Sequence, residues 1–270
     1  MEIGFYLFAF ILGSIVGSFL NCIIYRIETK QSFLKGRSFC PACKHKLNFF
    51  DLIPFFSFLF LKGKCRYYKT KISLQYPLVE IATGLIFLSV IIYHLSLISY
   101  QLSLIIDQLP LIVYQLLIAC FLIIVFVYDL KHSIIPDKVI FPAIAIAFIY
   151  NVYAMFVSNN VSIILNSVSA AMIAAGFFLF IVLISKGKWM GIGDIKLAFL
   201  MGLLLGFPNI LIALFLSFLI GAIIGVGLIL AKNKNFKSEI PFGPFLVTGT
   251  FMALFWGEKI IDWYLNILIF

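Results

Sequence analysis

Two aspartates stand at the ends of long apolar runs, where an ionised carboxylate is costly. Asp129 follows residues 110–128, none of which is charged, and Asp194 precedes residues 195–207, in which Lys196 is the only charged residue. Charged groups at membrane depth usually face the wet interior of a helix bundle and mark a function. Two carboxylates a few ångströms apart do not both ionise readily, so they can share one proton. One can then deprotonate water while the other protonates an amide, which hydrolyses a peptide bond without a covalent intermediate.

The length of its apolar run sets the expected depth of Asp194. The 13 residues from 195 to 207 lead to a turn at Phe207, Pro208 and Asn209. At about 1.5 Å per residue they rise about 20 Å through a hydrocarbon core of roughly 30 Å. The carboxylate is therefore expected about 10 Å below the membrane surface, and Asp129 at or just inside the same surface.

The competing interpretation is that each aspartate only anchors a helix end by pairing with a basic neighbour. Such neighbours are Lys131 and His132 for Asp129, and Lys188 and Lys196 for Asp194. Gly191 and Gly193 favour a functional site, because they weaken a helix locally and let a substrate strand approach closely. The three histidines are scattered in the sequence, and no serine or cysteine has an evident histidine-supported catalytic context.

The composition is typical of a polytopic membrane protein. The chain of 270 residues is 63% hydrophobic and 11% charged, with a mean hydropathy of +1.14, which is more apolar surface than a soluble domain can bury. We expect an all-α fold with about eight transmembrane helices. The segments lie near residues 3–25, 76–98, 110–128, 138–157, 161–185, 189–207, 209–231 and 243–266. The first has no basic n-region and no evident cleavage site, so we expect a retained span rather than a signal peptide.

The basic residues predict the orientation. With eight alternating spans, all of the 20 Lys and Arg residues except Lys259 fall on one side, which the positive-inside rule assigns to the cytoplasm. The net charge of +9 then reflects topology, and no nucleic-acid partner is expected. We predict a first transmembrane helix (1–25), a basic cytoplasmic loop containing cysteines (26–75) and a seven-helix intramembrane core (76–270).

Six motifs, in this order, resemble those of the type IV prepilin leader peptidases, which are membrane aspartyl proteases of the G-x-G-D type. They are "GSFLNCIIYRIE" (17–28), "RSFCPACKHKL" (37–47), "KISLQYPLVEIATG" (71–84), "YDLKHSIIPD" (128–137), "GIGDIKL" (191–197) and "IPFGPFL" (240–246). The resemblance covers nearly the whole chain and implies that Asp129 and Asp194 are the catalytic pair, with Gly191 and Gly193 as active-site backbone. It also implies cleavage of a short basic leader from type IV prepilin-like or competence pseudopilin precursors, after a glycine and at the cytoplasmic face.

Three further acids are candidates for contact with the basic leader. Asp137 lies eight residues after Asp129, and Pro136 argues against one continuous helix through both. We therefore prefer Asp129 as the catalytic acid and Asp137 as a helix N-cap or leader contact. Glu80 and Glu239 stand near cytoplasmic helix ends, and the alternative for both is an ordinary solvated helix end.

The resemblance also implies partners, cofactors and location. The partners are prepilin-like membrane proteins and the lipid bilayer, and the location is the bacterial cytoplasmic membrane, with the active site facing the cytoplasm. Proteolysis needs no cofactor. Many relatives also N-methylate the new N-terminus with S-adenosylmethionine, but this chain contains no glycine-rich dinucleotide fingerprint, so here that activity is expected from the family alone.

The basic loop carries a second group of reactive side chains. "CPAC" (40–43) followed by Cys65 resembles the paired C-x-x-C knuckles of the family, which are a zinc signature when complete. Tyr68 occupies the position of the fourth thiolate, and His45 could complete a Cys3His set with Cys40, Cys43 and Cys65. A zinc site and a degenerate knuckle held by packing both remain open.

Two other classes of membrane protein would also contain paired aspartates. Another G-x-G-D protease, of the presenilin or signal-peptide-peptidase kind, would also carry a Tyr-Asp pair, but the cysteine loop and "IPFGPF" argue against it. A proton-coupled transporter would use paired carboxylates too. It predicts acids nearer the bilayer midplane and broken helices in repeated halves, and we find no such repeat in the sequence.

Overall fold

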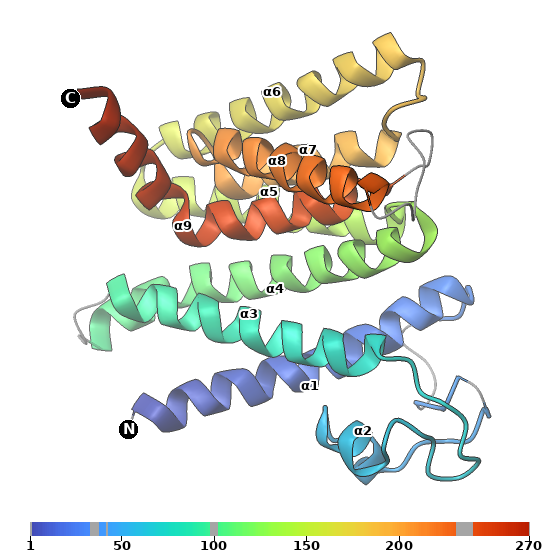
Figure 1. Ribbon diagram of the computed structural model, residues 1–270. Helices are drawn as coiled ribbons and strands as arrows, with labels where there is room; N and C mark the ends of the chain where they lie inside the picture. Colours follow the sequence, from blue (N-terminus) through green and yellow to red (C-terminus); the bar gives the residue numbers. More distant parts are fainter. Residues whose placement is uncertain (1, 33–37, 42, 98–101, 231–239, 270) are drawn as a thin grey trace. The chain divides into compact units, whose positions relative to one another are not determined.

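The protein is helical in the computed structural model, which describes residues 2–32, 38–41, 43–97, 102–230 and 240–269 (Figure 1). These ranges contain nine α-helices and one 3-10 turn, and within them the only β-type pairing is two isolated bridges. The chain forms two compact units, unit 1 (residues 1–124) and unit 2 (residues 125–270), and the boundary between them lies inside helix α4.

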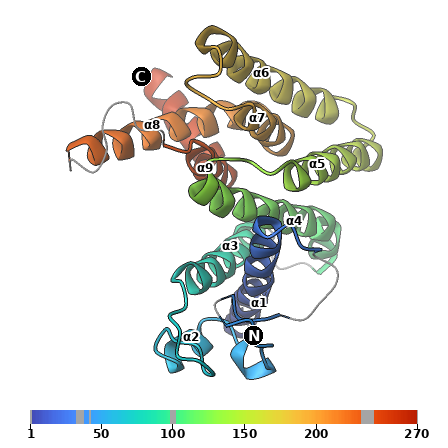
Figure 2. The same ribbon diagram turned by 90° about the vertical axis from the view of Figure 1, so that its right-hand side faces the viewer.

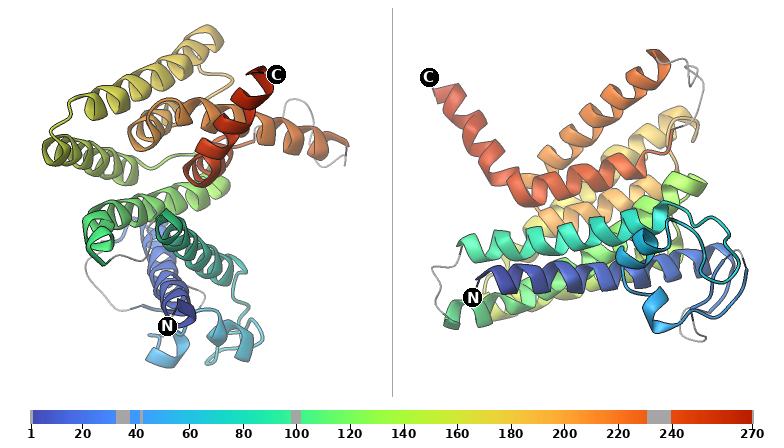
Figure 3. Two further views of the ribbon diagram at one scale, coloured as in Figure 1. Left: turned by 90° about the vertical axis from the view of Figure 1, so that its left-hand side faces the viewer. Right: turned by 60° about the horizontal axis from the view of Figure 1, so that its bottom comes forward.

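Unit 1 is built on two long helices, α1 (Glu2–Glu28) and α3 (Gln75–Leu97), which pack along each other (Figures 1 and 3). The segment between them contains η1 (Phe49–Asp51) and the short helix α2 (Phe56–Phe60), and the unit also includes the first part of α4 (Leu102–His132). Asn21 of α1 is buried and its Nδ2 donates to the carbonyl oxygen of Tyr76, at 3.0 Å. Such interhelical hydrogen bonds hold helices together where lipid offers no competing water.

Unit 2 is arranged around a short central helix, α7 (Ile192–Leu205), which contacts all four other complete helices of the unit (Figure 2). These are α5 (Asp137–Ser158), α6 (Ser162–Ser185), α8 (Asn209–Leu230) and α9 (Gly243–Ile269). Leu197, Leu200 and Met201 of α7 are fully buried, as expected for a helix that is apolar on every side. The first turn of this buried helix carries Asp194.

Gly202 lets α7 approach α6 closely. A Cβ at this position would collide with the backbone of Ala170 and Ala171. Small residues at such points allow close helix packing in membranes, where dispersion contacts and not the hydrophobic effect join the helices.

The predicted all-α, polytopic membrane architecture is confirmed. Each predicted apolar segment falls on one helix, although α4 begins eight residues before the predicted segment 110–128 and α7 is shorter than the predicted 189–207. The predicted turn at 207–209 separates α7 from α8. Among the described residues, six helices are long and apolar enough to cross a membrane: α1, α3, α4, α5, α6 and α8. Helix α7 has 14 residues, about 21 Å, which is shorter than the hydrocarbon core. The division of the chain into eight crossings stays a prediction.

Candidate active site

Asp129 lies in the last turn of α4 and only 4% of its surface is exposed. Its Oδ2 accepts a hydrogen bond of 3.0 Å from the backbone N–H of Gly243, the first residue of α9. The first N–H groups of a helix have no partner within the helix and carry a partial positive charge. The start of α9 therefore orients this carboxyl group.

Gly243 is a part of the site that sequence reasoning did not single out. A Cβ at this position would lie 2.5 Å from Asp129 Oδ2, so only glycine allows the N–H to come this close. In the sequence, "IPFGPFL" (240–246) served only as one of the six motifs that resemble the family, and it did not point to Gly243 as part of the site. The local signal was a glycine followed by Pro244, which is typical of a helix start.

Asp194 is the third residue of α7 and is also buried, with 8% of its surface exposed. Its Oδ2 accepts the N–H of Gly191, at 3.1 Å, while its own N–H donates to the carbonyl oxygen of Gly191, at 3.2 Å. The bond from the Gly191 N–H to the Asp194 carboxylate is one half of a capping box at the helix start, and the other half is absent because glycine has no side chain. The expectation that Gly191 weakens a helix is therefore wrong, because α7 begins at Ile192 and Gly191 is its N-cap. Gly193 lies in the first turn of α7, and its weakening effect stays a prediction.

Gly193 allows the connection between α4 and α5 to approach α7. A Cβ on Gly193 would lie 3.0 Å from the Cβ of Ile135, a buried residue of that connection. Asp129 and Asp194 are close enough for their charges to interact. Unit 2 thus brings together four of the predicted site residues: both aspartates and both glycines.

Lys196 pairs with Asp137, although it was considered as the neutralising partner of Asp194. Its Nζ lies 2.5 Å from Asp137 Oδ1 and 5.0 Å from the centre of the Phe141 ring. Pro136 separates α4 from α5, as predicted, but the N-cap of α5 is Pro136 and Asp137 is the first helical residue. The N-cap role predicted for Asp137 is wrong, because its side chain is turned to Lys196.

Glu80 lies in unit 1 and is not a solvated helix end. It is buried in α3, and its Oε2 accepts the N–H of Phe55, at 2.8 Å. Phe55 has a left-handed backbone (φ 58°), so this bond fixes a strained point of the loop against α3. Glu239, the other glutamate predicted to meet the leader, lies outside the described residues.

The three loop cysteines converge in unit 1. The sulfur atoms of Cys40, Cys43 and Cys65 all lie within 4.8 Å of one another, and those of Cys43 and Cys65 are 3.7 Å apart. Two thiolates at tetrahedral zinc, each about 2.3 Å from the metal, would lie about 3.8 Å apart. The spacing of the donors therefore fits zinc.

Two backbone turns of the same form hold these cysteines. The N–H of Cys40 donates to the carbonyl oxygen of His45, and the N–H of Cys65 donates in the same way to that of Thr70. In the second turn Tyr68 stands where the first has Cys43, and its side chain points out, 67% exposed. The His45 ring lies on the Tyr67 ring, with centroids 3.8 Å apart, and His45 does not belong to the group formed by the cysteine sulfurs.

The environment of Cys65 favours a thiolate. Burial raises the pKa of this thiol, but the N–H groups of Tyr68 and Tyr67 and the neighbouring Cys43 and Cys40 thiols outweigh burial, so the pKa lies below its ordinary value. Metal ions bind the thiolate form of cysteine. For Cys43 the N–H of His45 lowers the pKa, but burial and the Cys40 and Cys65 thiols outweigh it, so that pKa lies above its ordinary value. The sulfur spacing and the lowered pKa of Cys65 point to the same chemistry.

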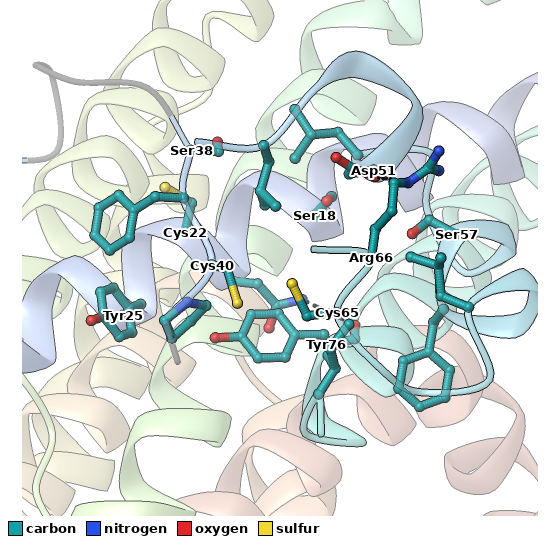
Figure 4. Close-up of a pocket in the computed structure, with 18 of the residues that line it drawn as sticks. Ser18, Cys22, Tyr25, Ser38, Cys40, Asp51, Ser57, Cys65, Arg66 and Tyr76 are labelled. Atoms are coloured by element: carbon teal, nitrogen blue, oxygen red, sulfur yellow. Dashed lines mark hydrogen bonds and ion pairs between the residues drawn. The ribbon is translucent and has the colours of Figure 1, made fainter. Parts of the chain in front are cut away.

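A cavity of about 140 Å³ adjoins the cysteines, between α1, α3 and the loop (Figure 4). Its wall combines aromatic rings with buried carboxylates, among them Tyr25, Tyr67, Tyr76, Asp51 and Glu80. Asp51 pairs with Arg66, at 2.8 Å, and accepts a hydrogen bond from the Tyr67 hydroxyl, at 3.0 Å. Sequence reasoning missed this cavity, because its lining residues are spread over more than 60 positions without a common motif.

Comparisons with known proteins identify relatives of the whole chain. Residues 11–94 match the family model for the bacterial peptidase A24 N-terminal domain, and residues 116–226 match the type IV leader peptidase family. Proteins named prepilin leader peptidase/N-methyltransferase are similar along nearly their full length. The one from Aeromonas hydrophila is 30% identical over 95% of this chain and 92% of its own, and the one from Bacillus subtilis (strain 168) is 31% identical over 95% and 96%. No solved structure matches.

Proposed function

The chain belongs to the type IV leader peptidase family, and we propose that it is an intramembrane aspartic endopeptidase that removes the basic leader of type IV prepilin-like or competence pseudopilin precursors. One observation carries the proposal. Two buried carboxylates in unit 2, Asp129 and Asp194, are each oriented by the N–H of a glycine at a helix start and interact through their charges.

The proposed mechanism needs only these two carboxyl groups and a water molecule. The ionised member takes a proton from the water, whose oxygen attacks the carbonyl carbon of the scissile bond. The protonated member donates its proton to the amide nitrogen, and the carbon–nitrogen bond breaks. The glycine N–H groups hold the two carboxyl groups in place through the reaction, which is the kind of positioning that proximity effects require.

The location we propose follows from the distribution of charge. Lys and Arg residues mark the cytoplasmic side, and the loops on that side adjoin Asp129 and Asp194. A precursor whose basic leader stays in the cytoplasm would present its cleavage site at this face of the cytoplasmic membrane. Asp137 on the same face, and Glu239, are the candidates to meet the positive leader.

We also propose a second activity, N-methylation of the new N-terminus. The relatives carry this activity in their names, and S-adenosylmethionine would supply the methyl group. The cavity of unit 1 is our candidate for its site, because tyrosine rings attract a sulfonium cation through cation–π contact and the Asp51 and Glu80 carboxylates favour positive charge. The buried Asp51 Oδ1 contacts Arg66 but makes no hydrogen bond, so it can still accept one from a ligand.

Binding measurements test this cavity apart from proteolysis. Ser57 lines the cavity, and Ser57→Phe should fill it. We expect this variant to lose binding of S-adenosylmethionine in equilibrium dialysis while it still cleaves the leader. Thr29→Phe, at an exposed position outside the lining, is the control. Unchanged binding in Ser57→Phe would mean that S-adenosylmethionine binds outside this cavity.

We propose further that Cys40, Cys43 and Cys65 bind a structural zinc ion, with the His45 imidazole as fourth ligand. The sulfur spacing supports three of the ligands, while His45 would have to leave the Tyr67 ring to bind. Zinc would then stabilise the two turns that form one wall of the cavity.

Membership in this family removes the presenilin-like alternative. The decisive experiment for the peptidase is co-expression with a pilin-like precursor, comparing Asp129→Asn, Asp194→Asn and Asp137→Asn. We expect each of the first two to lower cleavage by at least about 10²-fold, and Asp137→Asn to retain it.

Three outcomes would count against the proposal. Cleavage by both Asp129→Asn and Asp194→Asn would refute the mechanism. Loss in Asp137→Asn with retention in Asp129→Asn would refute the choice between those acids. Proton flux into liposomes that depends on the two aspartates, without cleavage, would support the transporter.

A further inference from the structure

An apolar surface stands out in the loop of unit 1. Six large apolar side chains between residues 50 and 60 are exposed, and Phe50 and Phe60 reach 67% and 81%. The six are Phe50, Leu52, Ile53, Phe56, Leu59 and Phe60, and we call them the apolar patch. The only acid in this stretch, Asp51, is paired with Arg66. Phe50, Ile53, Phe56 and Phe60 line one pocket together, and an exposed apolar patch normally marks a surface that meets a partner or a membrane.

The segment that carries the patch contacts α1 and α3 within their lengths and not beyond their ends. Phe55 donates its N–H to Glu80, five residues inside α3, and Ser57 shares the cavity wall with Ser18, ten residues before the end of α1. At about 1.5 Å per residue, these contacts lie about 7 to 15 Å inward from the helix ends. Both helices are candidate membrane spans at these points. Figure 1 shows α2 beside α1 and not beyond its end.

The backbone of this segment is suited to a place at the membrane boundary. The N–H groups of Ser57, Leu59 and Leu61 donate to carbonyl oxygens one turn earlier, and that of Phe55 donates to Glu80. Backbone donors with such partners can leave water at little cost. The segment can therefore enter the headgroup region without leaving these groups unsatisfied.

The charges that flank the patch favour an anionic bilayer. Lys62, Lys64 and Lys69 follow it and Lys46 precedes it, and all four are exposed. An apolar face with basic residues beside it is the pattern of elements that lie in the membrane interface, where anionic headgroups attract the cations.

We propose that the apolar patch is an interfacial membrane anchor, inserted into the bilayer that α1 and α3 cross. The segment predicted as a loop in the cytoplasm is then held against the lipid surface. Its anchor fixes the distance of the cysteine turns and the cavity from the bilayer. This proposal does not depend on the enzymatic activity.

Tryptophan fluorescence in vesicles tests the anchor. The native Trp189, Trp256 and Trp263 are first replaced by Phe. Phe60→Trp is then compared with Tyr68→Trp, at a position of the same loop that is also exposed but lies next to Lys69. The full-length protein is placed in vesicles of phosphatidylethanolamine and phosphatidylglycerol with brominated acyl chains. We expect the Phe60→Trp emission to be blue-shifted and mostly quenched, and that of Tyr68→Trp to be quenched mainly by aqueous iodide.

Three outcomes would overturn the proposal. Iodide quenching of Phe60→Trp that matches the control would place the patch in water. Protection from both quenchers would mean that protein covers it, either a partner or a second copy. Phe56→Trp, on the same helix, repeats the measurement if Phe60→Trp does not fold, and the absence of bromolipid quenching there has the same meaning.

Discussion

Both units bury carboxylates, and a backbone N–H holds Glu80 of unit 1 as it holds the two aspartates of unit 2, but Asp51 of unit 1 is held by a different means. In unit 2, Asp129 and Asp194 accept hydrogen bonds from glycine N–H groups at helix starts. In unit 1, Asp51 is neutralised by the Arg66 guanidinium and bound by the Tyr67 hydroxyl. A backbone N–H orients a carboxyl group without adding a full opposite charge, so the group can still gain and lose a proton. In the Asp51–Arg66 ion pair the charge of the carboxylate is neutralised and the pair holds the loop of unit 1 together, which is a structural task.

Among the variants proposed here, Gly243→Ala should have the largest effect, because it disturbs the backbone N–H that orients an acid of unit 2. The added methyl would lie 2.5 Å from Asp129 Oδ2, so α9 must move and the hydrogen bond that orients the carboxyl group is lost. We expect the rate of leader cleavage to fall by at least about 10²-fold, since displacements near 1 Å at a catalytic group have effects of that size. The rate is measured with purified enzyme and a precursor peptide.

Gly227→Ala is the matched control, because a Cβ on Gly227 in α8 would meet no atom within 4 Å. It should leave cleavage unchanged. Full activity in Gly243→Ala would mean that the bond to α9 does not position Asp129 for the reaction.

The cysteine cluster tests whether the loop of unit 1 has a structural task that is separate from leader cleavage by unit 2. If zinc has a structural task there, Cys40→Ser should lower the zinc content of the purified protein from about one per chain to near zero, while leader cleavage by unit 2 persists. Zinc is measured by mass spectrometry on the same samples that are assayed. Cys22→Ser, at a cysteine outside the cluster, should keep the zinc.

Tyr68→Cys adds a thiol to the cysteine cluster, whereas Cys40→Ser removes one. It places a thiol where the second turn lacks one, and it should tighten zinc binding only if His45 is not already the fourth ligand. Equal zinc content in the wild type and Cys40→Ser would leave packing alone to explain the two turns.

The order of the long helices and most of their bounds followed from hydropathy, because only long apolar runs can cross a membrane. The start of α4 at Leu102 did not, since the notable apolar run begins only at Pro110. The nearness of Asp129 and Asp194 could also be predicted, because few acids stand at the ends of long apolar runs in this sequence. The partners of the acids were not predictable in the same way. The N–H of Gly243 reaches Asp129 across 114 positions of sequence, and a backbone donor has no side-chain type to mark it. Lys196 turned to Asp137 because both emerge near the surface, which sequence neighbours do not reveal.

Gly202→Ala tests the packing that holds α7 at the centre of unit 2. A Cβ would collide with the backbone of Ala170 and Ala171, and overpacking of this kind costs about 1–3 kcal/mol. We expect a lower free energy of unfolding in mixed micelles, followed by circular dichroism.

Gly176→Ala in α6 is the control, because a Cβ there would meet nothing within 4 Å. Alanine is the better helix former by about 0.5–1 kcal/mol, so this variant should be as stable as the wild type or more so. A stability loss equal to that of Gly202→Ala would mean that helix flexibility, and not the contact with α6, explains both results.

Lys196→Met gives the smallest expected effect and tests Asp137, the acid that is ion-paired, like Asp51, among the described residues of unit 2. The side chains of Lys196 and Asp137 are 27% and 61% exposed, and water screens such pairs, so the loss of stability should be about 0.2–1 kcal/mol. The kcat of leader cleavage should persist, because neither residue orients Asp129 or Asp194. Removing the cation also leaves Asp137 open to a basic leader, so KM for the precursor should stay equal or fall.

Lys188→Met, at an exposed position before α7, separates this effect from a general loss of positive charge. A large fall in kcat in Lys196→Met alone would show that the Asp137 pair supports the catalytic carboxylates, and the contrast between the two ways of holding an acid would no longer apply within unit 2.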